Sequence, residues 1–319
     1  MRPFSTVSRC KVPVALYHTV SNAYLPHVKN LYSYRSVSLF KNDLDFLARN
    51  YNFISLDTLL NHIAGNETLP GNPLLLTFDD GFREMYEIVM PLLLQKGLPA
   101  TFFLISNSLD NKFLPYRNKI SLILDKIVVP GNDSLQKSLS SFLNLNGFEC
   151  SDIRKALLSL KYSNCQTIDE LAEIAEVDFS QYLKNDKPFL DTVQVKEMIG
   201  QGFTTGAHSA EHPNFAELSD DQKLEQIVTS IRFLEEKEVL THRAFAFPFH
   251  SNMISEEFYN NIVNSKEVEI ILGTNGIVRN KQPRHYQRFH LDYNSGSIRK
   301  ILLDYYAKGL IKDYLNLQK

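Results

Sequence analysis

The chain has 319 residues, and its 34 lysines and arginines nearly balance its 36 aspartates and glutamates, which gives a formal net charge of −2. This balance argues against nucleic acid as a partner, because binding a phosphate backbone requires a surplus of basic side chains. With 44% hydrophobic residues, 13 glycines and 13 prolines, the composition excludes a disordered or fibrous chain and is typical of a globular protein.

Short apolar runs alternate with amphipathic segments in two blocks of the chain. In the first block, strands are predicted at residues 12–17, 51–54, 73–78 and 98–105, with helices at 38–50, 56–63 and 81–96. In the second block, helices are predicted at residues 192–201, 219–238, 253–265 and 295–317, with strands at 203–207, 244–247 and 269–272. This alternation indicates a parallel β/α architecture with enough units for a barrel.

The alternation is interrupted at residues 109–190, where apolar residues recur every three or four positions. We expect a helical insertion, with Thr167 and Glu170 at the spacing of a capping box. A small packed subdomain is the interpretation we favour, and a cap over a groove or a dimer contact are the alternatives. The oligomeric state is left open.

Cellular location is constrained only weakly. Three cysteines are an odd number at spacings that suit no disulfide framework. The first residues contain no long apolar region typical of a signal peptide, and no stretch is apolar enough for a transmembrane segment. We therefore expect a soluble, cytoplasmic protein.

The segment Thr77-Phe78-Asp79-Asp80-Gly81 follows an apolar strand, at the end where β/α folds build their sites. Two adjacent carboxylates there can diverge, so that one holds a cation and the other accepts a proton. Gly81 would give the turn its backbone freedom. The alternative interpretation is that Asp80 only caps the following helix.

A second cluster is the pair His208 and His212, four residues apart. On a helical turn these imidazoles would share one face and could bind one divalent ion, although two histidines in a solvated loop are the plain alternative. With Asp80 they form a three-ligand set that leaves positions open for water, which is typical of hydrolytic metal sites.

The segments ALYHTVS, LLLTFDDG, LPATFFL, FTTGAHSAEHPNF and FAFPFH occur in the order found in the polysaccharide deacetylase family, the NodB-homology carbohydrate esterases, which the chain closely resembles. The resemblance covers most of residues 11–108 and 191–292. It implies one domain, residues 1–319, folded as a distorted (β/α) barrel of about seven parallel strands, with the helical insertion at 109–190 and a C-terminal helix. It also implies removal of N-acetyl groups from an amino sugar by a metal-bound water, with zinc the usual divalent metal.

By the same resemblance, Asp79 corresponds to the catalytic base, and Asp80, His208 and His212 correspond to the metal ligands. Thr77 and Ser209 are expected either to order these residues or to be satisfied turn hydroxyls.

The segment Phe245–His250 departs from the family's RxPY motif, which lines the groove and donates a backbone N–H to the oxyanion. Ala246 replaces the arginine, Phe249 the tyrosine, and His250 a common glycine. We expect Pro248, Phe249 and His250 to contact substrate. Arg288 is our hypothesis for the missing arginine that orients the base.

Histidines supply the candidates for the general acid. His290 is our choice, with His250 as competitor, and His18 is expected near the groove floor as a substrate contact. Four further histidines are interpreted as surface or loop residues: His27, His62, His242 and His285.

The sequence therefore predicts a metal-dependent carbohydrate N-deacetylase acting on an acetylated amino sugar in a polysaccharide, oligosaccharide or glycolipid precursor. The alternatives are a catalytically silent carbohydrate-binding protein, favoured by the lost arginine and the bulky His250, and an amidohydrolase for a small non-sugar amide. The near-neutral charge fits an uncharged acetylated sugar.

Overall fold

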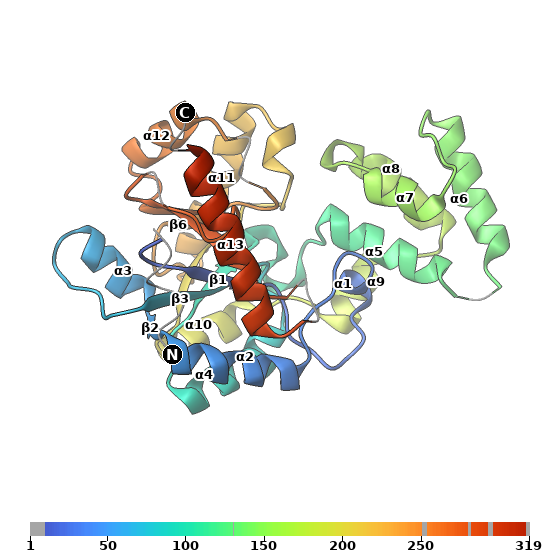
Figure 1. Ribbon diagram of the computed structural model, residues 1–319. Coiled ribbons are helices and arrows are strands. Elements are labelled where there is room, and N and C mark those ends of the chain that lie inside the picture. Colours follow the sequence, from blue (N-terminus) through green and yellow to red (C-terminus); the bar gives the residue numbers. More distant parts are fainter. Residues whose placement is uncertain (1–9, 130, 251–253, 280–281, 293–295, 317–319) are drawn as a thin grey trace.

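The computed structural model describes residues 10–129, 131–250, 254–279, 282–292 and 296–316, and seven of its parallel strands close into a barrel (Figure 1). Going around the ring, the order is β1, β8, β7, β6, β5, β4 and β3, and β3 pairs back with β1. The strands, including the additional strand β2, are β1 (Val14–Tyr17), β2 (Asn52–Ile54), β3 (Pro73–Phe78), β4 (Thr101–Leu104), β5 (Thr204–Ala207), β6 (Ala244–Ala246), β7 (Ile270–Gly273) and β8 (His285–His290).

Strand β3 explains the distortion of the barrel. Its first half pairs with β2, in the register Asn52 to Pro73, and its second half pairs with β1, in the register Val14 to Leu75. All six residues of β3 are buried, as the continuous apolar run predicts for a strand covered on both faces. The predicted distorted (β/α) barrel is confirmed.

Besides the short helix α1 (Pro26–Lys29), which was not predicted and packs on the insertion, the helices outside the insertion lie near the predicted ranges, although α4 (Met90–Lys96) begins later than predicted. The others are α2 (Val37–Asn50), α3 (Leu56–Ile63), α10 (Thr192–Gly200), α11 (Asp220–Glu236), α12 (Glu256–Asn264) and α13 (Ile298–Asn316). Helix α4 follows a π-helical turn and ends at Gly97, whose φ of 62° is left-handed, as is common for a glycine that ends a helix. The predicted helix ends at Met253, Ser295 and Leu317 lie outside the described residues.

The described part of the insertion contains five α-helices and projects from one side of the barrel (Figure 1). They are α5 (Tyr116–Ile127), α6 (Asp133–Leu145), α7 (Ile153–Ser159), α8 (Cys165–Ile174) and α9 (Phe179–Asp186). Helices α5 to α8 bury a separate apolar cluster that includes Ile120, Leu143 and Leu157. The insertion is therefore a packed unit.

The predicted start of α8 at Thr167 is wrong. A 3₁₀ turn at Tyr162–Asn164 leads directly into the helix, so α8 begins at Cys165 and Thr167 lies within its first turn. The capping interaction instead belongs to that turn, where Asn164 Oδ1 accepts a hydrogen bond from the Lys161 N–H.

Among the described residues, no helix combines the length and apolarity needed to cross a bilayer. The three cysteines are free thiols.

Candidate active site

The turn after β3 places two carboxylates side by side. Asp80 and Gly81 both have left-handed backbone conformations, with φ of 75° and 74°, which Asp and Gly tolerate better than other residues. The following helical turn starts only at Met85, with Glu84 at its N-cap. Asp80 is therefore free of the capping role that the sequence also allowed.

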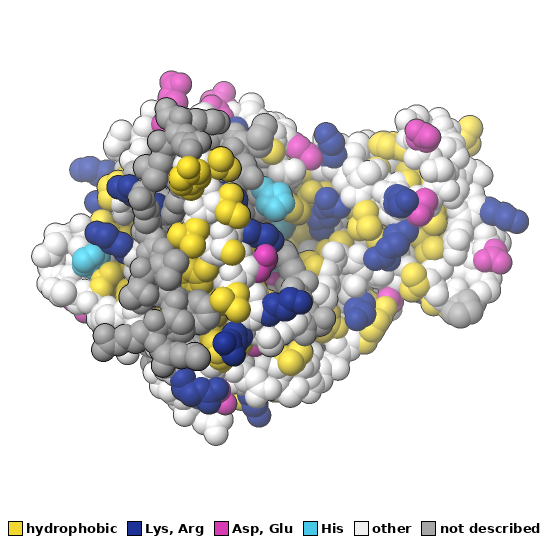
Figure 2. Space-filling model, viewed as in Figure 1, with side chains coloured by type: hydrophobic (Ala, Val, Ile, Leu, Met, Phe, Trp, Pro, Cys, Tyr) yellow, Lys and Arg dark blue, Asp and Glu magenta, His cyan; other side chains and the backbone are white. Residues whose placement is uncertain are grey.

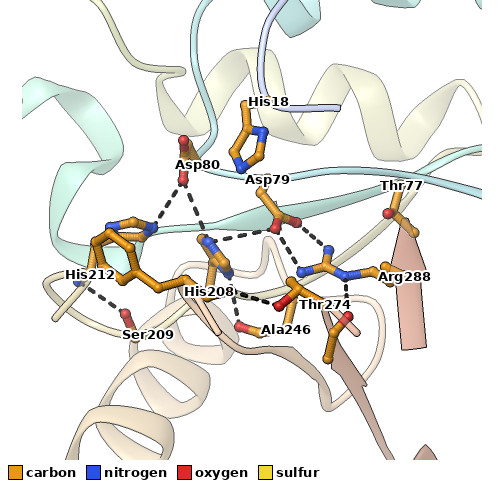
Figure 3. A network of polar contacts seen from close by, with 12 residues as sticks. His18, Thr77, Asp79, Asp80, His208, Ser209, His212, Ala246, Thr274 and Arg288 are labelled. Atoms are coloured by element: carbon orange, nitrogen blue, oxygen red, sulfur yellow. Dashed lines mark hydrogen bonds and ion pairs between the residues drawn. The ribbon is translucent and has the colours of Figure 1, made fainter. Parts of the chain in front are cut away.

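Asp79 is bound by Arg288, which reaches it from β8. The guanidinium donates from Nη1 to Oδ1 at 2.5 Å and from Nη2 to Oδ2 at 2.7 Å, and both side chains are buried (Figure 3). Burial opposes ionisation of Asp79, but the charge and hydrogen bonds of Arg288 outweigh it and hold the pKa of Asp79 below the usual value. The structure thus places Arg288 where the missing motif arginine was expected to act.

The predicted metal ligands converge in front of Asp79. The Asp80 Oδ1 atom lies 3.3 Å from His212 Nε2 and 3.5 Å from His208 Nε2. His208 Nδ1 donates to the Ala246 carbonyl at 2.8 Å. The other ring nitrogen, Nε2, therefore carries a lone pair on the side of Asp80, where it can bind a cation. Burial lowers the pKa of His208 to about 4, which keeps the imidazole neutral.

This donor set fits a divalent cation. Three ligand atoms, one each from Asp80, His208 and His212, lie within 4.8 Å of one another. The buried Asp80 Oδ1 accepts no hydrogen bond within the described part of the chain, which is unfavourable for a carboxylate unless a cation replaces the donor. Two imidazoles and one carboxylate are a common set for catalytic zinc, with a position left for water.

The predicted helical turn between the two histidines is wrong. Ser209 and His212 have φ of 67° and 60°, so residues 208–212 form a loop, and the histidine rings meet with centroids 4.9 Å apart. Ser209 Oγ accepts the His212 N–H at 3.0 Å, while Gln226 Oε1 accepts the N–H groups of Ala210 and Glu211. Ser209 therefore orders the ligand loop.

Thr77 differs from Ser209. Its Oγ1 donates to the Ala15 carbonyl of the neighbouring strand at 2.8 Å, so it is a satisfied hydroxyl within the sheet.

Sequence reasoning missed a buried ion pair beside the two aspartates. His18 follows β1, and its Nδ1 and backbone N–H lie 2.7 and 2.6 Å from Asp292 Oδ2. Burial alone would lower the pKa of His18, but Asp292 outweighs burial and raises it to about 9. His290 stacks on His18 with centroids 5.5 Å apart, and burial together with the His18 charge lowers its pKa to about 3.

These residues line a cavity of about 380 Å³ between the barrel and the insertion. Figure 2 shows histidine and basic side chains gathered where the two parts meet. The barrel contributes Leu16, His18, Leu31, Tyr32, Asp79, Asp80, His208, His212, Phe247, Phe249, His250, Thr274 and His290, and the insertion contributes Arg117, Asn118 and Leu158. The insertion thus has its own core and also forms one wall of the cavity.

Most of the predicted substrate contacts reach this cavity, including His18, Phe249 and His250. The Phe249 ring packs on His212 at 4.9 Å, and Thr274 Oγ1 donates to the Phe249 carbonyl at 2.7 Å. Pro248 is buried, and the structure does not place it among the lining residues it describes.

The interpretation of His27 as a surface residue is wrong. It is only 2% exposed, its Nδ1 is 2.7 Å from the Tyr182 hydroxyl of the insertion, and burial lowers its pKa to about 3. His285 is half-buried and stacks on Tyr259, His62 is exposed, and His242 pairs with Asp57 at the surface.

The model of one protein family, described as polysaccharide deacetylase, matches residues 66–267 of the chain. Among the curated proteins, none matches this chain in sequence.

Solved structures of deacetylases resemble the whole chain. The Streptococcus pyogenes deacetylase PplD in complex with acetate has a TM-score of 0.58 and 17% identity, over 93% of this chain and 98% of PplD. IcaB from Ammonifex degensii has a TM-score of 0.57 and 16% identity, over 92% of this chain and 96% of IcaB. A de-N-acetylase from Aggregatibacter actinomycetemcomitans has a TM-score of 0.56 and 15% identity, over 91% of this chain and 99% of the de-N-acetylase. At these identities the likeness shows a shared fold.

Proposed function

Because this chain belongs to the polysaccharide deacetylase family, we propose that it is a metal-dependent hydrolase that removes N-acetyl groups from an amino sugar in a polysaccharide, oligosaccharide or glycolipid precursor. The family membership supports the enzyme class, a carbohydrate N-deacetylase. The observation that carries the proposal is the convergence of Asp80, His208 and His212 beside an Asp79 held by Arg288.

Asp80, His208 and His212 would hold the cation, and the chemistry of the donor set favours zinc. When bound, a divalent metal polarises an amide carbonyl and lowers the pKa of water. The contact of His208 Nδ1 with the Ala246 carbonyl leaves the lone pair of His208 Nε2 for the metal, and the hydrogen bond from the His212 N–H to Ser209 Oγ holds the loop that carries His212.

Asp79 is the proposed general base. Its carboxylate is kept ionised by Arg288, and Oδ2 lies 3.6 Å from His208 Nε2, so it is next to the ligand set without belonging to it. The bidentate contact fixes both oxygens and leaves Asp79 able to accept a proton from the attacking water.

We assign proton donation to the leaving amine to His18 in place of His290 or His250. Asp292 holds His18 protonated, whereas burial keeps His290 neutral. Both rings line the cavity, and His18 lies on the same side of the site as the two aspartates (Figure 3). A protonated imidazole facing the substrate can deliver the proton that the amine requires.

The contact between Arg288 and Asp79 weakens the case for a catalytically silent sugar-binding protein. That alternative depended partly on the loss of the motif arginine at Ala246, and here a guanidinium from β8 binds the Asp79 carboxylate. The backbone N–H of Phe249 as an oxyanion donor and the cytoplasmic location stay predictions.

Incubating the zinc-loaded protein with N-acetylglucosamine oligomers tests the proposal. We expect equimolar acetate and free amine, detected by enzymatic acetate assay and mass spectrometry. Oligomers that bind but stay fully acetylated would instead identify a binding protein.

A further inference from the structure

The insertion places one cation, Arg117, in the wall of the cavity. Arg117 occupies the first turn of α5, and its side chain lines the same cavity as Asp80 and His212. Its guanidinium lies 5.8 Å from the centre of the Phe249 ring, and that ring packs on His212. One aromatic ring therefore separates Arg117 from the proposed metal ligands.

Two other charged side chains at the cavity have buried partners of opposite charge. Asp79 pairs with Arg288, and His18 pairs with Asp292. In contrast, no carboxylate within the described ranges forms an ion pair with Arg117. Its Nη1 donates to the Leu158 carbonyl, and the guanidinium also interacts with the Tyr116 hydroxyl. The remaining N–H donors of its five can bind a ligand.

Neighbouring basic residues of the insertion have structural partners. Lys119, two positions along α5, pairs with Asp169 at 2.7 Å, and Arg154 donates to Asn30 Oδ1 and to the Asn30 carbonyl. Arg117 differs from both because it contacts the Leu158 carbonyl and the neighbouring aromatic residues Tyr116 and Phe249. These aromatic contacts hold the guanidinium in place without neutralising its charge.

The start of α5 adds to the positive character of this wall. Pro115 precedes the helix and provides no capping side chain, and no acidic residue occupies the first turn. The N-terminal end of the helix dipole therefore favours an anion near the first turn of α5, which contains Arg117.

We propose that Arg117 determines substrate specificity by binding a negatively charged group, a carboxylate or a phosphate, on the acetylated amino sugar or on the residue next to it. The proposal rests on the proposed deacetylase function and adds the substrate class: an anionic glycan in place of the uncharged sugar that the overall charge balance suggested. Arginine suits this role because its planar guanidinium binds oxyanions through two parallel hydrogen bonds.

Matched pairs of probes test the proposal and separate the two anions. Carboxylate is tested with a hyaluronan tetrasaccharide against N-acetylchitotetraose, and phosphate with N-acetylglucosamine 1-phosphate against N-acetylglucosamine. We expect the wild-type protein to have a higher kcat/KM for at least one anionic probe than for its neutral match, by roughly 10- to 100-fold, the range for a hydrogen bond to a charged group.

Arg117→Gln should reduce that preference to near unity, mainly by raising KM for the anionic probe, and Arg117→Lys should retain part of it. Lys119→Gln removes the same charge from the same helix and should leave the preference intact. Thermal melting checks that each variant folds. Equal or better use of the neutral probes, or a preference that survives in Arg117→Gln, would overturn the assignment while the deacetylase function stands.

If no probe releases acetate, the proposed function fails, and the assignment of Arg117 is then decided by calorimetry. Tighter binding of an anionic probe to the zinc-loaded wild-type protein than to Arg117→Gln supports it, and equal binding contradicts it.

Discussion

The two walls of the cavity are built in different ways. On the barrel side, Arg288 reaches Asp79 and Asp292 reaches His18 across more than 200 positions of sequence, and each pair is buried. On the insertion side, the helices α5 to α8 share a separate apolar core, and Arg117 at the cavity pairs with no carboxylate among the described residues. The barrel is thus organised to hold reacting groups, whereas the insertion presents a surface that can vary with substrate.

This difference predicts that substitutions in the two walls have separable effects. Changes on the barrel side should lower kcat, and changes on the insertion side should alter KM or metal affinity by smaller factors.

The largest effect is expected for Asp79→Asn. The amide cannot accept the proton from water, so kcat should fall by roughly 10²- to 10⁴-fold, the usual contribution of a general base. Metal content, measured by mass spectrometry of the purified protein, should not change, because Asp79 lies outside the ligand set. Turnover within a few-fold of wild type would remove Asp79 from this role.

Arg288→Ala leaves the buried Asp79 carboxylate without its partner. We expect the free energy of unfolding to fall by about 3–5 kcal/mol, as for other broken buried ion pairs, and turnover to fall far more than metal affinity. Urea denaturation measures the first effect. Arg288→Met combined with Asp79→Asn removes both charges and should recover much of the lost stability.

The pair of His18 and Asp292 predicts an alkaline limit to activity. A proton donor must be protonated, so kcat should decline at high pH with an apparent pKa above the ordinary histidine value of about 6.5. Asp292→Asn removes the group that raises the pKa of His18 to about 9, and the decline should move to lower pH. An unchanged pH profile in this variant would argue against His18 as the donor.

The raised pKa of His18 also makes the stability of the protein depend on pH. Because the folded-state pKa is raised, the stabilising contribution of the pair is complete below about pH 6.5 and is lost as the pH rises through about 9. Asp292→Asn should therefore destabilise the protein more at pH 6 than at pH 10.

The smallest effect is expected where the insertion contacts the ligand loop. The Tyr162 hydroxyl donates to Glu211, which lies between His208 and His212, and Asn107 also donates to Glu211. Tyr162→Phe removes one of these hydrogen bonds and should cost about 1 kcal/mol of stability. Zinc affinity should weaken only slightly, as measured by competition with a chromogenic chelator, and a large loss would show that the insertion belongs to the metal site.

The barrel was readily predicted from sequence because buried parallel strands are continuous apolar runs, as in β3 and β4. The carboxylates and histidines were found because they lie in short local motifs. Asp292 was missed, since its partner His18 is remote in sequence. One local signal was available: Asp292 follows His290 by two positions, and alternate residues of an extended segment face the same side.

The insertion was the less predictable part. Its helices followed the apolar period, but the wall formed by Arg117 and Leu158 depends on how the unit packs on the barrel. The same packing buries His27 against Tyr182, which no local pattern indicated. The conformation at Ser209 and His212 was also hidden, because two left-handed residues that are not glycine leave no clear mark in the sequence.

The central claim is that Asp80, His208 and His212 hold the metal that this hydrolase needs. The most direct measurement is a zinc titration of chelator-stripped protein, with acetate release from N-acetylglucosamine oligomers followed at each step. The account predicts no release from the stripped protein, recovery that saturates at one zinc per chain, and no recovery in Asp80→Ala. Full acetate release by stripped protein of verified metal content would contradict it.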